Sequence, residues 1–297
     1  MKTCFIKNKH SHYFQLHAEP CVLAIGFFDG VHVGHQKVIK RAVQQAKQMN
    51  MKAAVMTFLP HPKEVISRGK ECVDMLTTFT QKERVIADLG VDLLYVVQFN
   101  KDFASIAPEQ FVQEYLCALQ VKHVVVGFDF TYGKFGKGNV FTLAKDGKGN
   151  FNVTVIEKLA YNEEKISSTA IRQKIRDGDI GMANLYLGRE FETTGFVQFA
   201  EQNKLVINNI QHVLPETGYY EIIMKYKKIL KRTIAYCNRE DGELYVESDR
   251  TDRTLLHLRD NDQVTVIWQM NAEHLFVART IYVRKPIDTF QWLDYSL

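Results

Sequence analysis

The chain has 297 residues, enough for two globular domains, and its hydrophobic fraction of 46% favours ordinary cores over disorder. The formal charge of +4 suits small anionic ligands, but no concentrated basic segment stands out, so we expect no nucleic-acid partner. Five scattered cysteines without a Cys-x-x-Cys pair, and the lack of a signal peptide or membrane span, predict a cytoplasmic protein in a reducing compartment.

Apolar runs and stretches of helical periodicity alternate through the first half of the chain. The predicted buried strands are Val22–Ile25, Lys52–Phe58, Leu93–Phe99, Val121–Gly127 and Phe151–Ile156. Helices are predicted after His35, from a capping box at Thr80–Glu83 to Gly90, from Pro108 to Leu119, and from Ser167 to Gly178. This alternation predicts an α/β domain, a Rossmann-like parallel sheet with helices on both faces.

The pattern changes after Leu187. From Gly195 to about residue 283, short runs rich in Val, Ile, Tyr and Thr are separated by turn residues such as Asn238–Gly242. That pattern predicts a separate and smaller antiparallel sheet or barrel. We therefore expect a first domain at residues 1–187 and a second domain at 188–297.

Residues 26–35, Gly-Phe-Phe-Asp-Gly-Val-His-Val-Gly-His, join the first predicted strand to the first helix. The loop faces the positively polarised N-terminus of that helix, where an anion binds. His32 and His35 point to one side and can donate to one anion, and Gly34 lets a phosphate approach the backbone. Two incidental surface histidines, or half of a metal site, are the alternatives. No third zinc ligand is placed nearby by spacing, and we favour phosphate binding.

A second anion site is predicted at Ser167-Ser168-Thr169, which offers hydroxyls and free amides at a helix N-terminus, with Arg172 one turn later. Alone, this pattern is better explained by ordinary N-capping. As the partner of a triphosphate-binding loop, Arg172 and Lys165 would neutralise the remaining phosphate charge.

Two further loops leave the carboxyl edge of the predicted sheet, where ligands of such sheets bind. Residues 57–62 (TFLPHP) follow the second strand, and residues 127–138 (GFDFTYGKFGKG) follow the fourth. The second loop lacks the Gly-x-x-x-x-Gly-Lys-Ser/Thr pattern, so we reject a Walker P-loop. Its aromatic residues Phe128, Phe130 and Tyr132 either line a pocket for a flat ring or pack in the core.

Taken in order, GFFDGVHVGH, TFLPHP, GFDFTYGKFGKG and ISSTAIRQKIRDGDI closely resemble the adenylyltransferase domain of bacterial FAD synthetases, the bifunctional riboflavin kinase/FMN adenylyltransferases. The resemblance covers about residues 15–190. It implies in-line attack of an FMN phosphate oxygen on the α-phosphorus of ATP, giving FAD and pyrophosphate. Mg²⁺ would bridge the phosphates and be held mostly by substrate oxygens, with no protein metal site.

The resemblance also implies roles for individual residues. Catalytic contacts to the ATP phosphates would come from His32, His35, Lys165, Ser168, Thr169 and Arg172. The ATP-binding loop would be formed by Gly26, Phe27, Asp29, Gly30, Gly34 and Ser167. The flavin end of the site would hold Phe58, Pro60, His61, Pro62, Asp129 and Phe130.

The second domain departs from the family pattern. The family's kinase carries a Gly-x-Pro-Thr-Ala-Asn segment and a catalytic glutamate in a Glu-x-His context. Residues 198–210 lack that segment here, and Glu247 precedes Ser248-Asp249 without a histidine. Leu214–Tyr220 resembles the strand that follows in the kinase, which predicts that the barrel itself survives. We therefore expect a degenerate riboflavin kinase-like barrel without kinase activity.

Other functions stay open at this point. One is a flavin-responsive, non-catalytic protein whose barrel contacts RNA or protein. Another is adenylylation or cytidylylation of a different phosphorylated alcohol, and a third is a bifunctional enzyme whose barrel retains kinase activity. The intact set of His32, His35 and Arg172 favours an enzyme, because a pure sensor would not need it for turnover.

Overall fold

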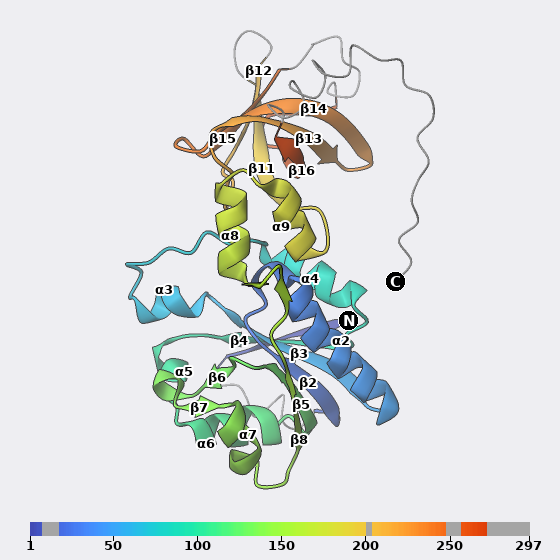
Figure 1. Cartoon of the computed structure of the whole chain (residues 1–297), viewed down its shortest axis with the longest axis vertical. Coiled ribbons are helices and arrows are strands. Elements are labelled where there is room, and N and C mark those ends of the chain that lie inside the picture. Colours follow the sequence, from blue (N-terminus) through green and yellow to red (C-terminus); the bar gives the residue numbers. More distant parts are fainter. Residues whose placement is uncertain (8–17, 200–203, 248–256, 272–297) are drawn as a thin grey trace. The chain divides into compact units, whose positions relative to one another are not determined.

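The computed structural model describes residues 1–7, 18–199, 204–247 and 257–271 (Figure 1). Its contacts divide the chain into two compact units. The first comprises Met1–Ile175, Met182–Glu190 and Gln211–Val213, and the second comprises Arg176–Gly181, Phe191–Ile210 and the described residues from Leu214 onward. The units are therefore interleaved in sequence, and beyond residue 190 the three residues Gln211–Val213 belong to the first unit.

The first unit is built on a six-stranded sheet in which every neighbouring pair is parallel. Its strands are β1 (Lys2–Ile6), β2 (Cys21–Ile25), β3 (Lys52–Leu59), β4 (Leu93–Gln98), β5 (Val121–Gly127) and β8 (Asn152–Ile156). Their spatial order is β1-β4-β3-β2-β5-β8. The central strand β2 is buried at all five positions, because each of its residues is apolar. The predicted Rossmann-like parallel sheet is confirmed.

The remaining elements before residue 188 are mostly helical. The longer helices are α2 (Val33–Gln48), α4 (Phe79–Asp88), α8 (Ser168–Arg176) and α9 (Ile180–Leu187). The shorter elements are η1 (Asp29–Val31), α3 (Pro62–Ile66), α5 (Lys101–Ser105), α6 (Pro108–Phe111), η2 (Val112–Cys117), η3 (Lys134–Gly136) and α7 (Val140–Asp146), with strand pairs β6 (Thr131–Tyr132) and β7 (Gly138–Asn139), and β9 (Ala160–Tyr161) and β10 (Glu164–Lys165). Among the described residues, no helix is long and apolar enough to cross a membrane.

Alternate residues of β2 feed two hydrophobic clusters, one on each face of the sheet. Val22 and Ala24 pack in the cluster that contains the apolar sides of α2 and α4. Leu23 packs in the other cluster with Phe111 and Tyr115, which come from α6 and η2. The connections from β2 to β4 thus use one face, and the connection from β4 to β5 uses the other. The order in which strands are added to the sheet reverses between the neighbouring strands β2 and β5. This position is the topological switch point where open α/β sheets bind ligands.

The structure differs from the sequence predictions in three local details. The edge strand β1 was missed, because Lys2–Ile6 is short and mixes polar with apolar residues. The capping box lies at Thr78 rather than at Thr80–Glu83: Thr78 Oγ1 accepts from Gln81 N at 3.2 Å, and Gln81 Oε1 accepts from Thr78 N at 2.8 Å. That register buries Ile86 in the core. The helix predicted from Pro108 is the short α6 followed by η2, which has the wider π-helical turn.

The second unit is a closed antiparallel barrel. Its strands are β11 (Glu192–Phe199), β12 (Lys204–Asn208), β13 (Gly218–Tyr226), β14 (Ile229–Asn238), β15 (Glu243–Glu247) and β16 (Gln263–Asn271), in the spatial order β11-β12-β15-β14-β13-β16. Trp268 and Tyr220 are fully buried and meet edge to face at 5.4 Å, and Trp268 Nε1 donates to Thr193 Oγ1 at 3.0 Å. The predicted barrel is confirmed. Ser248, Asp249 and the predicted pattern beyond residue 271 lie outside the described residues.

Candidate functional site

The loops that leave the carboxyl ends of β2, β3, β4 and β5 gather along one edge of the sheet. All four contribute walls to one cavity, and the loops after β2 and β5 flank the switch point. Three of these loops, which contain GFFDGVHVGH, TFLPHP and GFDFTYG, were predicted to emerge here. The fourth, residues 99–106 after β4, was not predicted as part of the site.

The loop after β2 turns sharply before α2. Phe28 adopts the left-handed conformation with φ 53°, and Gly30 follows with φ 76°. A Cβ on Gly34 would lie 3.1 Å from the ring of His32. Glycine is therefore favoured at position 30 by backbone conformation and at position 34 by the close approach of an imidazole ring.

His32 is the N-cap of α2. Its Nδ1 accepts a hydrogen bond from His35 N at 3.2 Å, and the two rings stack with 3.5 Å between centroids. Burial, followed by the charge of Lys165, lowers the pKa of His32 to about 4, so the ring is neutral at pH 7. Because Nδ1 acts as the acceptor, the ring proton lies on Nε2. His32 is therefore a neutral hydrogen-bond donor with a fixed orientation.

His35 packs against the ring of His32 and against the edge of Phe28, whose centroid is 5.2 Å away. Burial, followed by the neighbouring His32, lowers the pKa of His35 well below its usual value. Its Nδ1 is buried and has no hydrogen-bond partner among the described residues. The side chain also lines the cavity, although this nitrogen itself is buried beneath its surface.

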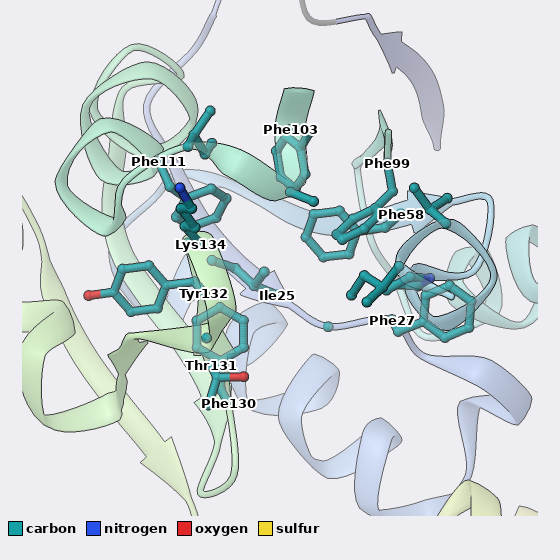
Figure 2. Close-up of a pocket in the computed structure, with 18 of the residues that line it drawn as sticks. Ile25, Phe27, Phe58, Phe99, Phe103, Phe111, Phe130, Thr131, Tyr132 and Lys134 are labelled. Carbon is teal, nitrogen blue, oxygen red and sulfur yellow. The ribbon is translucent and has the colours of Figure 1, made fainter. Parts of the chain in front are cut away.

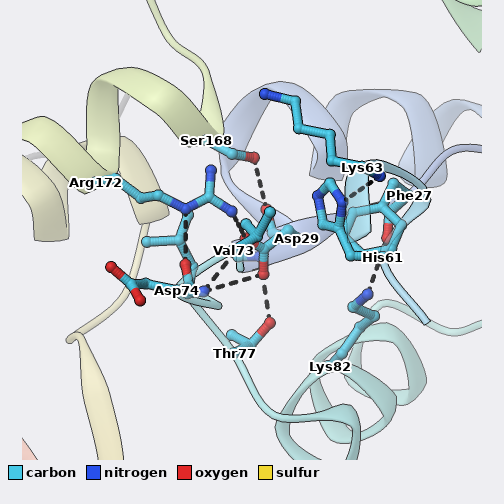
Figure 3. Close-up of polar contacts among 12 residues, drawn as sticks. Phe27, Asp29, His61, Lys63, Val73, Asp74, Thr77, Lys82, Ser168 and Arg172 are labelled. Atoms are coloured by element: carbon cyan, nitrogen blue, oxygen red, sulfur yellow. Dashed lines mark hydrogen bonds and ion pairs between the residues drawn. The ribbon is translucent and has the colours of Figure 1, made fainter. Parts of the chain in front are cut away.

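Asp29 organises the other side of the loop although its residue is only 1% exposed (Figure 3). Its carboxylate accepts from Leu76 N at 3.1 and 3.2 Å, accepts from the amide of Thr77, and pairs with the Arg172 guanidinium. Burial raises the pKa of Asp29, while the charges of Arg172 and Lys82 oppose that shift. Two predicted site residues, Asp29 and Arg172, thus bind each other.

The N-terminus of α8 lies against the same loop. Ser168 Oγ donates to the carbonyl oxygen of Asp29 at 3.0 Å. Ser167 Oγ accepts from Ala170 N at 3.2 Å, which makes Ser167 the N-cap, as its simpler interpretation predicts. Thr169 is exposed on the first turn. The predicted second anion site therefore adjoins the first one.

Lys82 contacts the loop directly but was not predicted as a site residue. It is 1% exposed, its Nζ donates to the carbonyl oxygen of Phe27 at 2.9 Å, and the same atom lies 4.3 Å from the centroid of the Phe27 ring. Burial lowers the pKa of Lys82 to about 8, and the Asp29 carboxylate opposes that shift. No sequence signal distinguishes this lysine, because a charge on an amphipathic helix normally faces solvent.

A cavity of about 770 Å³ opens beside the loop (Figure 2). Its aromatic walls include Phe27, Phe58, Phe99, Phe103, Phe111, Phe130 and Tyr132. Phe58, Phe99 and Phe103 pack against one another with centroids 5.4 to 6.2 Å apart. A mainly apolar cavity with a few polar groups is suited to a flat ring system. Phe99, Phe103 and Phe111 were missed because apolar residues at that spacing are typical of an ordinary core.

The residues predicted for the flavin end are only partly brought together. Phe58, Pro62, Asp129 and Phe130 line the cavity, whereas Pro60 and His61 are not among its lining residues. His61 is the N-cap of α3, where its Nδ1 accepts from Lys63 N at 3.1 Å. Its ring packs edge-on against Phe27 at 4.2 Å, and burial lowers its pKa to about 4. His61 thus supports the loop rather than the cavity wall.

Lys165 and Asp129 form a partly exposed ion pair with 2.6 Å between Nζ and Oδ2. Lys165 Nζ also lies 4.6 Å from the centroid of the Phe128 ring, and Phe128 does not line the cavity. The charge of Lys165 lowers the pKa of His32 and that of Asp129 raises it, so the pair lies within electrostatic reach of the histidine. Lys165 therefore lies near the loop, as predicted, but bound to Asp129.

The described residues contain no group of three or more His, Cys, Asp and Glu side chains that could hold a metal ion. The carboxylates at the loop, Asp29 and Asp129, are paired with Arg172 and Lys165. The neighbouring cation weakens the attraction of such a carboxylate for Mg²⁺, because like charges repel. Binding of Mg²⁺ through substrate phosphates stays a prediction.

The parallel sheet, the glycine-rich loop and the histidine pair at a helix N-terminus define a nucleotidyltransferase. Residues 14–170 match the family model for FAD synthetase, and the chain belongs to that family. It is 42% identical over 230 residues to a bifunctional riboflavin kinase/FMN adenylyltransferase of Bacillus subtilis, covering 75% of this chain and 72% of that protein. It is 37% identical over 202 residues to an FAD synthetase of Listeria monocytogenes, covering 67% and 80%.

A comparison with solved structures shows a likeness that extends over nearly the whole chain. The crystal structure titled macrolide-efflux protein from Streptococcus pneumoniae matches with a TM-score of 0.80 and 23% sequence identity, covering 96% of this chain and 99% of that one. At this identity the likeness concerns the fold alone. It agrees with a parallel sheet followed by an antiparallel barrel.

Proposed function

We propose that this chain is an FMN adenylyltransferase, which converts ATP and FMN to FAD and pyrophosphate. The observation that carries the proposal is that one loop serves both the histidine pair and the aromatic cavity. His35 stacks on His32 and also lines the cavity, together with Phe27 from the same loop. The loop can therefore bind nucleotide phosphates next to a flat ring. Membership of the FAD synthetase family supports the same reaction.

The reaction requires little from the protein beyond positioning and charge stabilisation. An FMN phosphate oxygen forms a bond to the α-phosphorus of ATP, the bond from that phosphorus to the β-bridging oxygen breaks, and pyrophosphate leaves. The nucleophile is already an anion, so no general base is needed. We infer that His32 Nε2 and the free amides of α2 bind phosphate, aided by Lys165, Ser168, Thr169 and Arg172. Mg²⁺ enters with ATP as part of the substrate.

We assign this reaction to residues 1–187 and infer that the barrel, residues 188–297, is not a riboflavin kinase. The inference depends on the sequence between β11 and β13, where the Pro-Thr-Ala-Asn segment of the kinase is missing. Glu247 ends β15 without the histidine of the kinase motif. Without the threonine that helps to hold metal and phosphate, ATP is not placed for transfer to riboflavin.

The experiment gives purified chain ATP and Mg²⁺ with either FMN or riboflavin, and separates the flavin products. We expect FAD from FMN and no FMN from riboflavin. FMN formed from riboflavin would overturn the inference about the barrel, and absence of FAD from FMN would overturn the enzyme assignment. The variant His32→Ala is the control for a sensor: it should lose FAD formation, whereas a pure flavin sensor would keep its flavin affinity and have no turnover to lose.

A further inference from the structure

Three residues between β12 and β13, Gln211–Val213, belong to the first unit, and we call them the strap. His212 pairs with Met75 in a parallel bridge, and Val213 N donates to the carbonyl oxygen of Met75 at 3.2 Å. His212 is 5% exposed, and its Nε2 lies 2.8 Å from Gln81 Oε1. The strap is therefore a buried part of the first unit, although it follows the first two barrel strands in sequence.

A first chain of contacts runs from the strap to the nucleotide loop through residues 75–77. Met75 is fixed by the strap, and the next two residues supply the amides that bind the Asp29 carboxylate. The hydroxyl of Thr77 also accepts from Gly30 N at 3.2 Å. The segment held by the strap thus makes three backbone or hydroxyl contacts with residues 29 and 30.

A second chain of contacts runs through the start of α4. Gln81 Oε1 accepts from Thr78 N in the capping box, and it also accepts from His212 Nε2. Burial lowers the pKa of His212 to about 4, so the ring is neutral at pH 7 and carries its proton on the donating nitrogen. The next residue, Lys82, donates to the carbonyl oxygen of Phe27. Both series of contacts therefore end at residues 27–30.

We propose that the strap is a positioning element for the nucleotide loop and that His212 is its anchor. By holding Met75 and Gln81, the strap sets the segment that fixes Phe27, Asp29 and Gly30. This inference rests on the proposed function and extends it: residues beyond 190 complete the adenylyl-transfer site. It gives the second half of the chain a task that does not depend on kinase activity.

The test compares three variants of the full chain. His212→Ala removes the donor to Gln81, and His212→Gln supplies an amide donor in its place. His123→Ala is the matched control, because His123 is also buried and its Nε2 lies 2.8 Å from a side-chain oxygen, Thr154 Oγ1, away from the strap. Calorimetry measures binding of α,β-methylene-ATP with Mg²⁺, which needs no turnover, and steady-state assays measure KM for ATP and kcat.

His212→Ala should weaken analogue binding and raise KM for ATP about five- to tenfold, the effect of losing one positioning hydrogen bond, and His212→Gln should recover to within about twofold. His123→Ala should lower the melting temperature but leave both quantities unchanged. Wild-type analogue affinity in His212→Ala, or the same loss in His123→Ala, would overturn the proposal. If the wild-type chain makes no FAD but binds the analogue, the proposed function fails while the binding series still decides the role of His212. No analogue binding by the wild-type chain would overturn both.

Discussion

Replacing Lys82 with methionine tests whether this buried ammonium positions the loop at a cost to the stability of the fold. The side chain is 1% exposed, and methionine has a similar length without the charge. The carbonyl oxygen of Phe27 would not be left unsatisfied, because it also accepts from Thr57 Oγ1 at 2.8 Å. We expect Lys82→Met to raise the stability of the first unit at pH 7 and to lower FAD formation.

The magnitude follows from the pKa of Lys82, which burial lowers from an ordinary 10.5 to about 8. At about 1.4 kcal/mol for each tenfold change in proton affinity, keeping the charge buried at pH 7 costs roughly 3 kcal/mol. Loss of the hydrogen bond and the cation–π contact to Phe27 offsets about 1–2 kcal/mol of that. The net gain for Lys82→Met is therefore about 1–2 kcal/mol.

The pH dependence has a definite sign. Between about pH 8 and 10.5 the folded wild-type chain binds fewer protons than the unfolded chain, so wild-type stability rises with pH in that interval. Lys82→Met lacks this contribution. The advantage of the variant should therefore be largest at pH 7 and should shrink as the pH approaches 10.

Urea unfolding at pH 7 and pH 9.5 measures these differences. Both tryptophans, Trp268 and Trp292, follow residue 190, so fluorescence reports the second half of the chain while far-UV circular dichroism reports both units. Lys47→Met, at an exposed position of α2, is the matched control and should change neither transition. FAD formation by Lys82→Met should fall at least about tenfold, because the loop is misplaced. This reasoning would be refuted if the variant were less stable than wild type at pH 7, or if the difference in unfolding free energy between the two proteins grew with pH.

Three further predictions concern single residues of the site. His32→Ala should lower FAD formation about 100-fold, and NMR of the imidazole should show no titration of His32 between about pH 5.5 and 7.5, because its pKa is about 4; a His32 resonance that titrates near pH 6.5 would contradict this. Arg172→Ala should cost about 3 kcal/mol in urea unfolding at pH 7.5 and less as the pH falls, because burial raises the pKa of Asp29 and protonation relieves its stranded charge. Phe103→Ala should weaken FMN binding about tenfold in a fluorescence titration; unchanged affinity would place the flavin outside the cavity.

The fold was predictable where burial of an element produces a recognisable pattern in the sequence. Val22–Ile25 and Val124–Val126 are continuous apolar runs because both faces of a parallel sheet are covered. The edge strand Lys2–Ile6 has only one neighbour and carries no such run. The start of α4 was misplaced because Thr78 and Thr80 each make a plausible N-cap, and only packing selects Thr78.

The site was predictable where its requirements are local. Glycine is needed at position 30 for its positive φ and at position 34 because the His32 ring lies close, and both requirements arise within one short loop. The two glycines therefore belong to a motif that can be recognised in the sequence. Lys82 and His212 reach their partners across 55 and 131 residues of sequence. Nothing in α4 or in the barrel connection signals those contacts, because they exist only once the sheet has brought the segments together.

The electrostatics of the loop indicate how such a site would treat a triphosphate. Burial lowers the pKa values of His32, His35 and His61, so three imidazoles are neutral at pH 7 and do not repel one another. The guanidinium of Arg172 is largely neutralised by Asp29. The loop therefore offers oriented dipoles more than free positive charge, and Mg²⁺ would have to supply much of the neutralisation. We expect phosphate binding through many modest contacts, which favours release of pyrophosphate, because a site of strong fixed cations would retain that anion.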